Sequence, residues 1–424
     1  MKRLIVMLGK GQAKILGKED ISYNPADYFI PNTDKKPVHT PFLGYALAKL
    51  VPEYDVIHIL GTESSQWVGL LYFLIENSNN SAELEFLEKV IYSFENKTFF
   101  NDHVLIKDYE KILKKYLGIT AKIHVIPIGK NEQELWKIFE EIAEIPKDED
   151  IISLDITHGL RYQPFLVTLA FNYFQNIRKN VILKDVFYGA LELSSMYQNL
   201  TPILNLNNLL ILSKWIDAVK SFSDYGDIRA LNDLLTSAPD LKNKINKFSY
   251  YLNLNGAKKI RESAESLVNA IKNLRINDPN LTPLKFVKDA LMEVPKRILN
   301  ITTDWELFLY LAEKNWENGQ YVLSVLETYQ AILARVGDLT NRDSFHNEDN
   351  SKEVGSLAKK IKKIKKYVVK INKYRILAAH SDLGLSQTID ELVVEFPRLL
   401  KEITPLLKEL SYDDIKLKKR VCLS

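Results

Sequence analysis

The sequence predicts an α/β domain at the N-terminus and an all-helical region after it. Strand-like and helix-like segments alternate over the first half of the chain. Strand signals stop at about residue 205, and the rest reads as helices joined by polar connections. Hydrophobic residues make up 46% and charged residues 26% of the 424 residues, which is typical of a soluble globular protein. A chain of this length has room for two or three domains.

Five apolar segments are predicted to form a mostly parallel, Rossmann-like sheet. An unbroken apolar run is typical of a parallel strand that is buried on both faces. Alternation of such runs with helices indicates βαβ units with right-handed crossovers. The predicted strands are 4–8, 56–60, 123–128, 151–156 and a fifth that contains 186–188.

Two helices between these strands have recognisable starts. Thr40 precedes Pro41, which predicts a threonine N-cap followed by proline in the first turn. Asn131 is predicted to begin an amphipathic helix that runs to Ile145. Both helices would cover a face of the sheet, as βαβ connections require.

Glycine and small polar residues follow the predicted strands. Ligands of open α/β sheets bind beyond the carboxyl ends of the strands, and glycine there lets backbone N–H groups approach an anion. The loops are Gly9-Lys10-Gly11, Gly61-Thr62-Glu63-Ser64-Ser65, Gly129-Lys130, Thr157-His158-Gly159-Leu160-Arg161 and Gly189. Strand-to-helix turns favour these residue types in any such protein, so a single loop is weak evidence. Several such loops occur together, and Lys10 and Arg161 each add a positive charge to one of them, which favours a phosphate-bearing ligand. The dinucleotide fingerprint is absent, because Lys14 stands where its third glycine would be. A Walker-type Gly-Lys-Ser/Thr is also missing.

In the second half, a long lysine-rich helix is predicted to lead to Arg375 and His380. Its apolar residues follow a 4-3-4-3 spacing that suits a helix partner, and lysines fill the other faces. The apolar positions are Leu357, Ile361, Ile364, Val368 and Ile371. A solvated lysine face is the usual explanation of such a run, and attraction of RNA phosphates is the alternative.

Arg375 and His380 form the candidate catalytic pair. Arginine is permanently charged and can hold a phosphate, and histidine can transfer a proton near neutral pH. Positions i and i+5 differ by roughly 140° around a helix, so the two side chains do not share one face. If the pair acts, a second copy of the chain is expected to contribute across a two-fold axis.

The chain resembles the CARF–HEPN ribonucleases that accompany type III CRISPR systems. Asp155-Ile156-Thr157-His158-Gly159-Leu160-Arg161 is similar to the Asp-x-Thr-His-Gly-Phe-Arg signature of one CARF branch, with Leu160 in place of Phe. The Gly9 loop, Leu60-Gly61-Thr62 and Tyr188-Gly189-Ala190 are placed as in that branch, and Arg375 to His380 matches the HEPN motif Arg-x4–6-His. Glu317-Asn318-Gly319-Gln320-Tyr321 resembles a helix-hairpin turn found earlier in HEPN domains. Ile376 departs from the Asn, Asp or His that often follows the arginine.

This resemblance implies a CARF sensing domain over residues 1–204, a helical linker over 205–300 and a HEPN ribonuclease domain over 301–424. It implies a homodimer, or a larger assembly of dimers, that binds a cyclic oligoadenylate and cleaves single-stranded RNA without metal or other cofactor. Cyclic tetra-adenylate is the first candidate among activators. Arg375 and His380 would be catalytic, and the binding residues would be Gly9, Lys10, Gly11, Gly61, Thr62, Ser64, Thr157, His158, Gly159, Arg161, Tyr188 and Gly189.

Two alternatives stay open from the sequence. One alternative is a ring nuclease, in which the sensing domain itself cuts the cyclic messenger, and His158 is the residue that supports it. A non-catalytic nucleotide sensor is the other alternative, which the intact Arg375–His380 pair disfavours. The single cysteine, Cys422, leaves no disulfide framework or cysteine-based zinc site and indicates a reducing, cytoplasmic environment. No apolar run reaches membrane-spanning length, and the net charge of +3 does not by itself indicate a nucleic-acid partner.

Overall fold

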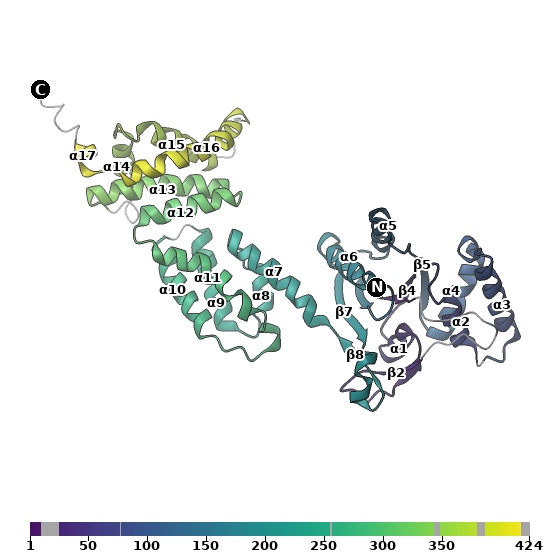
Figure 1. Cartoon of the computed structure of the whole chain (residues 1–424). Coiled ribbons are helices and arrows are strands. Elements are labelled where there is room, and N and C mark those ends of the chain that lie inside the picture. Colours follow the sequence, from purple (N-terminus) through teal and green to yellow (C-terminus); the bar gives the residue numbers. More distant parts are fainter. Residues whose placement is uncertain (10–24, 77, 255–256, 343–347, 380–385, 417–424) are drawn as a thin grey trace, which may run out of the picture. The chain divides into compact units, whose positions relative to one another are not determined.

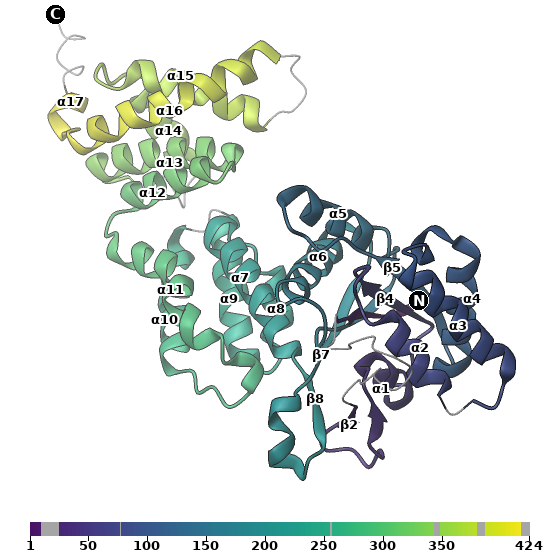
Figure 2. The same cartoon turned by 45° about the vertical axis from the view of Figure 1, so that its right-hand side comes forward.

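The computed structural model describes residues 1–9, 25–76, 78–254, 257–342, 348–379 and 386–416. The chain divides into two compact units, residues 1–210 and 211–424, which are drawn in Figures 1 and 2. The first unit contains a sheet with helices, and the second unit is built of helices in all the parts that are described. None of the described helices is long and apolar enough to span a bilayer.

The first unit is organised around one eight-stranded sheet. Its strands are β1 Lys2–Leu8, β2 Ala26–Phe29, β3 Val38–Thr40, β4 Val56–Gly61, β5 Thr120–Val125, β6 Ile151–Asp155, β7 Ile182–Gly189 and β8 Thr201–Asn205. The spatial order is β3-β2-β8-β7-β6-β1-β4-β5. From β7 to β5 all pairs are parallel, whereas β8 is antiparallel to β7 and β3 is antiparallel to β2. The predicted Rossmann-like, mostly parallel sheet is therefore confirmed.

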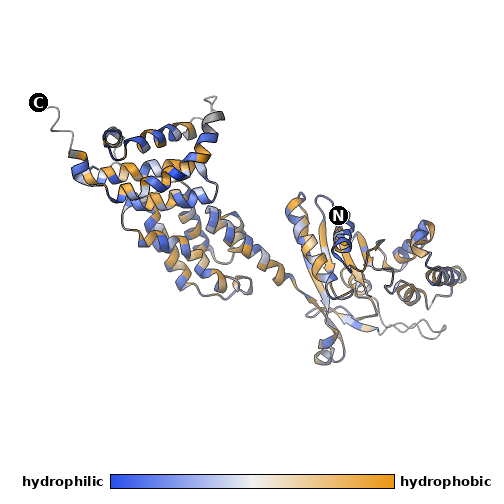
Figure 3. Ribbon diagram, turned by 45° about the horizontal axis from the view of Figure 1, so that its top comes forward, coloured by the Kyte–Doolittle hydropathy of each residue, from blue (hydrophilic) through white to orange (hydrophobic). Residues whose placement is uncertain are grey.

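The central strand β1 shows why an unbroken apolar run forms a doubly covered strand. Successive side chains of a strand point to opposite faces. Leu4, Val6 and Leu8 join the cluster built with α1 Leu43–Leu50, α2 Trp67–Ile75, α3 Ser81–Glu95 and α4 His103–Leu117. Ile5 and Met7 join the opposite cluster, built with α5 Glu132–Ala143 and α6 Gln163–Ile177. Both faces of the sheet are thus covered by helices, and its strands are mostly orange in Figure 3.

Three local predictions need correction or refinement. Thr40 is not a helix N-cap: it ends β3 opposite Ala26, and α1 begins at Leu43 with Phe42 at its N-cap. The ladder with β2 keeps Thr40 extended, and its hydroxyl instead accepts a hydrogen bond from the Phe42 nitrogen at 3.1 Å. The third predicted strand lies three residues too late, because β5 ends at Val125. Asn131 does cap α5, accepting from the Glu134 nitrogen at 2.9 Å.

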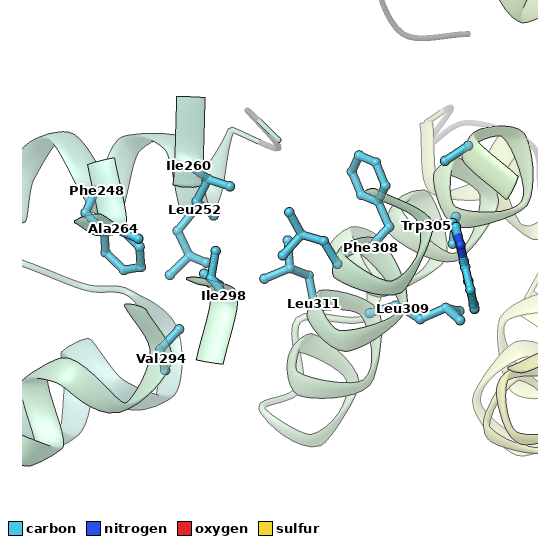
Figure 4. Packing of buried hydrophobic residues seen from close by; sticks show 14 of the residues in the cluster. Phe248, Leu252, Ile260, Ala264, Val294, Ile298, Trp305, Phe308, Leu309 and Leu311 are labelled. Carbon is cyan, nitrogen blue, oxygen red and sulfur yellow. The ribbon is translucent and has the colours of Figure 1, made fainter. Parts of the chain in front are cut away.

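The second unit consists of α-helices and one short 3₁₀ turn in its described parts. These helices are α7 Asn207–Tyr225, which starts in the first unit, α8 Arg229–Leu234, α9 Pro239–Asn253, α10 Ala257–Asn273, α11 Leu284–Asn300, α12 Asp304–Glu317, α13 Tyr321–Thr340, α14 Glu348–Ala358, α15 Lys365–Ala379, α16 Ser386–Lys408 and α17 Tyr412–Lys416. A single apolar cluster runs through them. Figure 4 shows Phe248 and Ile298 from the helices before residue 301 on one side of it, with Phe308 and Leu311 of α12 on the other.

The hairpin turn predicted at Glu317 to Tyr321 is confirmed, since α12 ends at Glu317 and α13 begins at Tyr321. Gly319 adopts a left-handed φ of 73° there, a conformation that glycine enters without steric cost. The Gln320 nitrogen donates to the Asn315 oxygen at 2.7 Å, which closes the turn.

The long lysine-rich helix is two helices instead of one. α14 ends at Ala358 and α15 begins at Lys365. Lysines three and four positions apart repel one another along a helix, and such repulsion opposes a continuous helix through this run. The apolar seam itself is correct, because Ile361, Ile364 and Val368 are all buried in the core of the second unit.

Candidate functional site

The carboxyl ends of the parallel strands meet at one edge of the sheet. β1, β4, β6 and β7 run in the same direction, so their following loops emerge together. We call these loops the sheet-edge site: Gly9 after β1, Thr62–Ser65 after β4, Thr157–Arg161 after β6, and Gly189 at the end of β7. The predicted binding residues Lys10 and Gly11 lie outside the described residues.

Direct contacts join the loops after β1 and β4. Ser65 Oγ donates to the Leu8 oxygen at 2.7 Å, and the Gln66 nitrogen donates to the Gly9 oxygen at 3.0 Å. Within the second loop, Ser65 Oγ also accepts from the Thr62 nitrogen at 2.9 Å. Ser65 therefore fixes the path of this loop, while Ser64 stays exposed for a ligand.

The loop after β6 closes against both of its neighbours. A Cβ added at Gly9 would come within 3.3 Å of the Gly159 nitrogen, so glycine allows this close approach. Gly159 has a left-handed φ of 99°. On the other side, Thr157 Oγ1 accepts a hydrogen bond from the Gly189 nitrogen at 2.8 Å. The structure therefore brings together Gly9, Thr157, Gly159 and Gly189, which were singled out from sequence.

Asp155 and His158 form a buried electrostatic pair beneath this loop. Burial raises the pKa of the Asp155 carboxyl and lowers the pKa of the His158 imidazole, and each charge partly offsets the shift of the other. Asp155 Oδ1 accepts from the Thr157 nitrogen at 2.8 Å, which ties the carboxylate to the loop backbone. Among described atoms, His158 Nε2 has neither solvent access nor a hydrogen-bond partner. A neutral, enclosed imidazole of this kind is suited to shaping the loop more than to attracting a phosphate.

A pocket of about 70 Å³ opens between these loops. It is lined by Leu8, Thr62, Ser64, Ser65, Ile128, Gly159, Leu160 and Gln163. Gln163 was missed by sequence reasoning, although it follows the motif by two residues. Its Oε1 accepts from the Leu160 nitrogen at 3.0 Å, and its Nε2 has no partner among the described residues while the side chain is 2% exposed. An unused amide donor at the wall of a pocket is a candidate for contacting a ligand.

Other predicted binding residues take different positions. Arg161 is exposed and is not among the residues that line the pocket. Tyr188 donates its hydroxyl to Glu192 Oε1 at 2.8 Å. The Gly129-Lys130 loop is filled from within the chain, because both backbone nitrogens donate to Glu134 Oε2 at 3.0 and 3.1 Å. That loop is therefore less available to a ligand anion than its sequence indicated.

The second candidate site lies on α15, which carries Arg375. His380 lies outside the described residues, so the structure gives no distance from Arg375 to His380. The guanidinium carbon of Arg375 lies 4.7 Å from the ring centroid of Tyr329 on α13. Arg375 Nε is buried without a hydrogen-bond partner, and no carboxylate of the described part of the chain forms an ion pair with this arginine.

Lysines of the run before Arg375 are partly neutralised by glutamates of α16 and by Glu409, which follows that helix. Lys363 pairs with Glu409 at 3.4 Å and Lys373 with Glu391 at 3.7 Å, while Lys370 pairs with Glu395. Other lysines of the run, such as Lys362 and Lys366, stay exposed. The solvated-face explanation therefore accounts for the exposed lysines, and the ion pairs account for the others.

A buried acid lies in the same helical unit. Glu327 of α13 has no solvent exposure, and burial raises the pKa of its carboxyl to about 8. Asn315 of α12 donates its Nδ2 to Glu327 Oε2 at 2.7 Å, which opposes the shift without cancelling it. Glu327 is therefore largely protonated at neutral pH.

In the described ranges no three His, Cys, Asp or Glu side chains gather as metal ligands would.

Comparison with known proteins supports the sequence-based family. Residues 5–192 match the family model described as the CARF domain of the CRISPR system endoribonuclease Csx1. Residues 211–301 match the model of the second domain of CRISPR-associated protein MJ1674. The protein of that name from Methanocaldococcus jannaschii is 26% identical over 368 residues, which are 82% of this chain and 55% of that protein.

The chain thus spans about half the length of the curated relative it matches. The CARF signature is confirmed by the match over the first unit, while the HEPN resemblance and the predicted three-part division stay predictions. The sheet topology agrees with the Rossmann-like fold expected of a CARF domain. The first unit therefore matches a CARF domain like that of the endoribonuclease Csx1, and most of the chain is similar to a CRISPR-associated protein.

Proposed function

We propose that this protein is an endoribonuclease that a cyclic oligoadenylate activates and that cleaves single-stranded RNA without a metal ion. The CARF match over residues 5–192 supports a nucleotide ligand for the first unit. The observation that carries the catalytic half is Arg375, whose cationic group has an aromatic partner and no carboxylate partner among the described residues. An arginine whose charge is not neutralised is available to a phosphate.

The sheet-edge site suits half of a cyclic ligand. Backbone nitrogens, threonine and serine hydroxyls and the Gln163 amide converge on a pocket of about 70 Å³. Pockets for drug-sized ligands typically have volumes of about 300–1,000 Å³. A second copy of the chain would double these donors around a symmetric ring of phosphates, so we propose that the ligand binds across a two-fold axis of a homodimer.

The proposed chemistry at Arg375 and His380 uses the substrate's own nucleophile. The 2′-hydroxyl of RNA attacks the adjacent phosphorus as a base removes its proton, and the 5′-oxygen leaves with a proton from an acid. His380 would transfer a proton, and Arg375 would neutralise the charge that develops on the phosphoryl oxygens. The products carry a 2′,3′-cyclic phosphate and a 5′-hydroxyl. DNA has no 2′-hydroxyl and is expected to stay intact.

The test is a cleavage assay with matched substrates. Fluorescent single-stranded RNA and DNA of one sequence are incubated with the protein, excess EDTA and, in turn, cyclic tri-, tetra- or hexa-adenylate. We expect RNA cleavage with at least one ring, unchanged by EDTA, with 2′,3′-cyclic phosphate ends. Arg375→Ala should lower the cleavage rate severely, to a residual level. Arg297→Ala is the matched control, because Arg297 also lies over a tyrosine, Tyr310, at 5.9 Å.

Each other outcome contradicts a definite part of the proposal. Loss of activity in EDTA, or 3′-hydroxyl ends, would contradict the 2′-hydroxyl mechanism. RNA cleavage that ignores every ring would contradict activation. Consumption of the cyclic ligand while RNA stays intact would establish a ring nuclease, and binding without either reaction would establish a sensor.

A further inference from the structure

We propose that Tyr329 is a positioning residue for Arg375, and that its ring face holds the guanidinium in place for the substrate phosphate. This inference rests on the proposed function of Arg375 as the phosphate-binding arginine. Tyr329 is on α13 and Arg375 is on α15, so the contact joins two helices of the second unit. The guanidinium carbon is 4.7 Å from the ring centroid, well inside the roughly 6 Å limit for a cation–π contact.

Burial of Tyr329 and partial burial of Arg375 strengthen the contact. Tyr329 is 7% exposed and packs in the apolar cluster of the second unit. Cation–π attraction increases when the cation loses water. Arg375 Nε is itself buried without a hydrogen-bond partner, so water does not hold this end of the side chain. The ring face is then the only partner of the guanidinium among the described residues.

The chemistry of the contact explains why a ring is suitable here. A carboxylate partner would use the N–H donors of Arg375 and cancel the charge that a phosphate needs. A guanidinium carries its N–H donors in its own plane, whereas the ring attracts the cation through the electrons of its face. Tyr329 can therefore orient Arg375 while leaving donors free for two phosphoryl oxygens.

The ring also has a fixed place of its own. Tyr329 Oη lies beside Gly355 of α14, where an added Cβ would come within 3.1 Å of it. Leu333 Cδ2 of α13 lies 3.6 Å from the same Cβ position. Tyr329 is thus enclosed by the apolar cluster and by Gly355 of α14, and a fixed ring is what a positioning residue requires.

The experiment measures RNA cleavage by the full chain at saturating cyclic oligoadenylate. Tyr329→Phe keeps the ring and should retain kcat within about threefold. Tyr329→Leu removes the ring, and we expect kcat to fall at least about tenfold, the equivalent of about 1.4 kcal/mol, with little change in KM for RNA. Tyr310→Leu is the matched control, since that tyrosine contacts Arg297 instead, and its kcat should be unchanged.

Two further measurements separate positioning from a general loss of structure. In an Arg375→Ala background, Tyr329→Leu should cause no additional loss, because the two residues act as one unit. If Tyr329→Leu does not fold, phenylalanines with increasing fluorine substitution are placed at 329. These keep the shape of the ring while weakening its attraction for a cation, so kcat should fall with each fluorine.

Failure of this inference is distinguishable from failure of the proposed function. Full activity of Arg375→Ala would remove the catalytic role of the arginine and with it the proposed function. An inactive Arg375→Ala combined with a fully active Tyr329→Leu, or with a flat fluorine series, would overturn the positioning role alone. Additive losses in the double variant would likewise overturn it.

Discussion

Glu327 offers a prediction whose magnitude follows directly from its burial. Its carboxyl has no solvent exposure, and its pKa is raised from the ordinary 4.5 to about 8, chiefly by desolvation. The unfolded chain releases this proton near pH 4.5, whereas the folded chain keeps it until about pH 8. Between these values the folded state binds the extra proton, so the free energy of unfolding decreases as pH rises.

The size of the effect follows from the shift of about 3.5 units. Each unit corresponds to 1.36 kcal/mol, so Glu327 lowers the free energy of unfolding by up to about 5 kcal/mol at pH 8 and above. Glu327→Gln removes the ionisable proton and keeps an oxygen that accepts from Asn315. We expect this variant to be more stable than wild type at pH 8, by an amount that shrinks toward pH 5.

Hydrogen exchange of the α12 and α13 amides measures this locally, without requiring the whole chain to unfold in one step. The ratio of wild-type to variant exchange rates at each pH cancels the intrinsic pH dependence of exchange. It should rise about tenfold per pH unit between pH 5 and 8. Glu317→Gln, at an exposed position of α12, should show no such slope. A flat ratio for Glu327→Gln would mean that the carboxyl is ionised throughout and that the reasoning from burial is wrong.

The remaining predictions concern the two candidate sites. His380→Ala should lower the RNA cleavage rate about 10²- to 10⁴-fold while dimerisation and ligand binding persist, and a fully active variant would reduce the Arg-His spacing to coincidence. Arg375→Lys should also be poor in the same assay, because an ammonium lacks the planar fork of donors. Arg161→Ala should raise the activator concentration for half-maximal RNase rate, with most of the rate restored at saturation, and identical titration curves would remove Arg161 from the site. Gly61→Ala should destabilise the first unit by about 1–3 kcal/mol in urea unfolding, because its Cβ would come within 2.5 Å of the buried Trp67 ring; an unchanged midpoint would contradict this packing.

The sequence alone determined the parts of the fold that local patterns specify. The run at residues 4–8 is apolar at every position, and such a run is stable only between two covering layers, as β1 shows. The hairpin turn at 317–321 was predictable because Gly319 has the left-handed φ that such a turn uses. The signature at 155–161 identified the CARF fold, which the family match over residues 5–192 supports.

Elements that depend on a distant partner were not predictable from local pattern. β2 and β3 are short, and they exist because they pair with each other and because β2 also pairs with β8. The same pairing holds Thr40 in a strand, although its local sequence reads as a helix cap. The lysine run lies between the end of α14 and the start of α15. Repulsion between lysines on successive turns opposes one continuous helix, and the spacing of the apolar residues does not show this break.

At the candidate sites, the sequence determined which residue types were present, and tertiary contacts decided what each can do. Glu134 occupies the nitrogens of the Gly129 loop, and burial lowers the pKa of the His158 imidazole, so two polar loops of similar appearance leave different groups for a ligand. Gln163 and Tyr329 were not singled out, because a buried glutamine or tyrosine on an apolar helix has no local pattern that marks it. Their proposed roles rest on an unpaired donor and a ring face that meet residues from other parts of the chain, and only the folded structure brings those groups together.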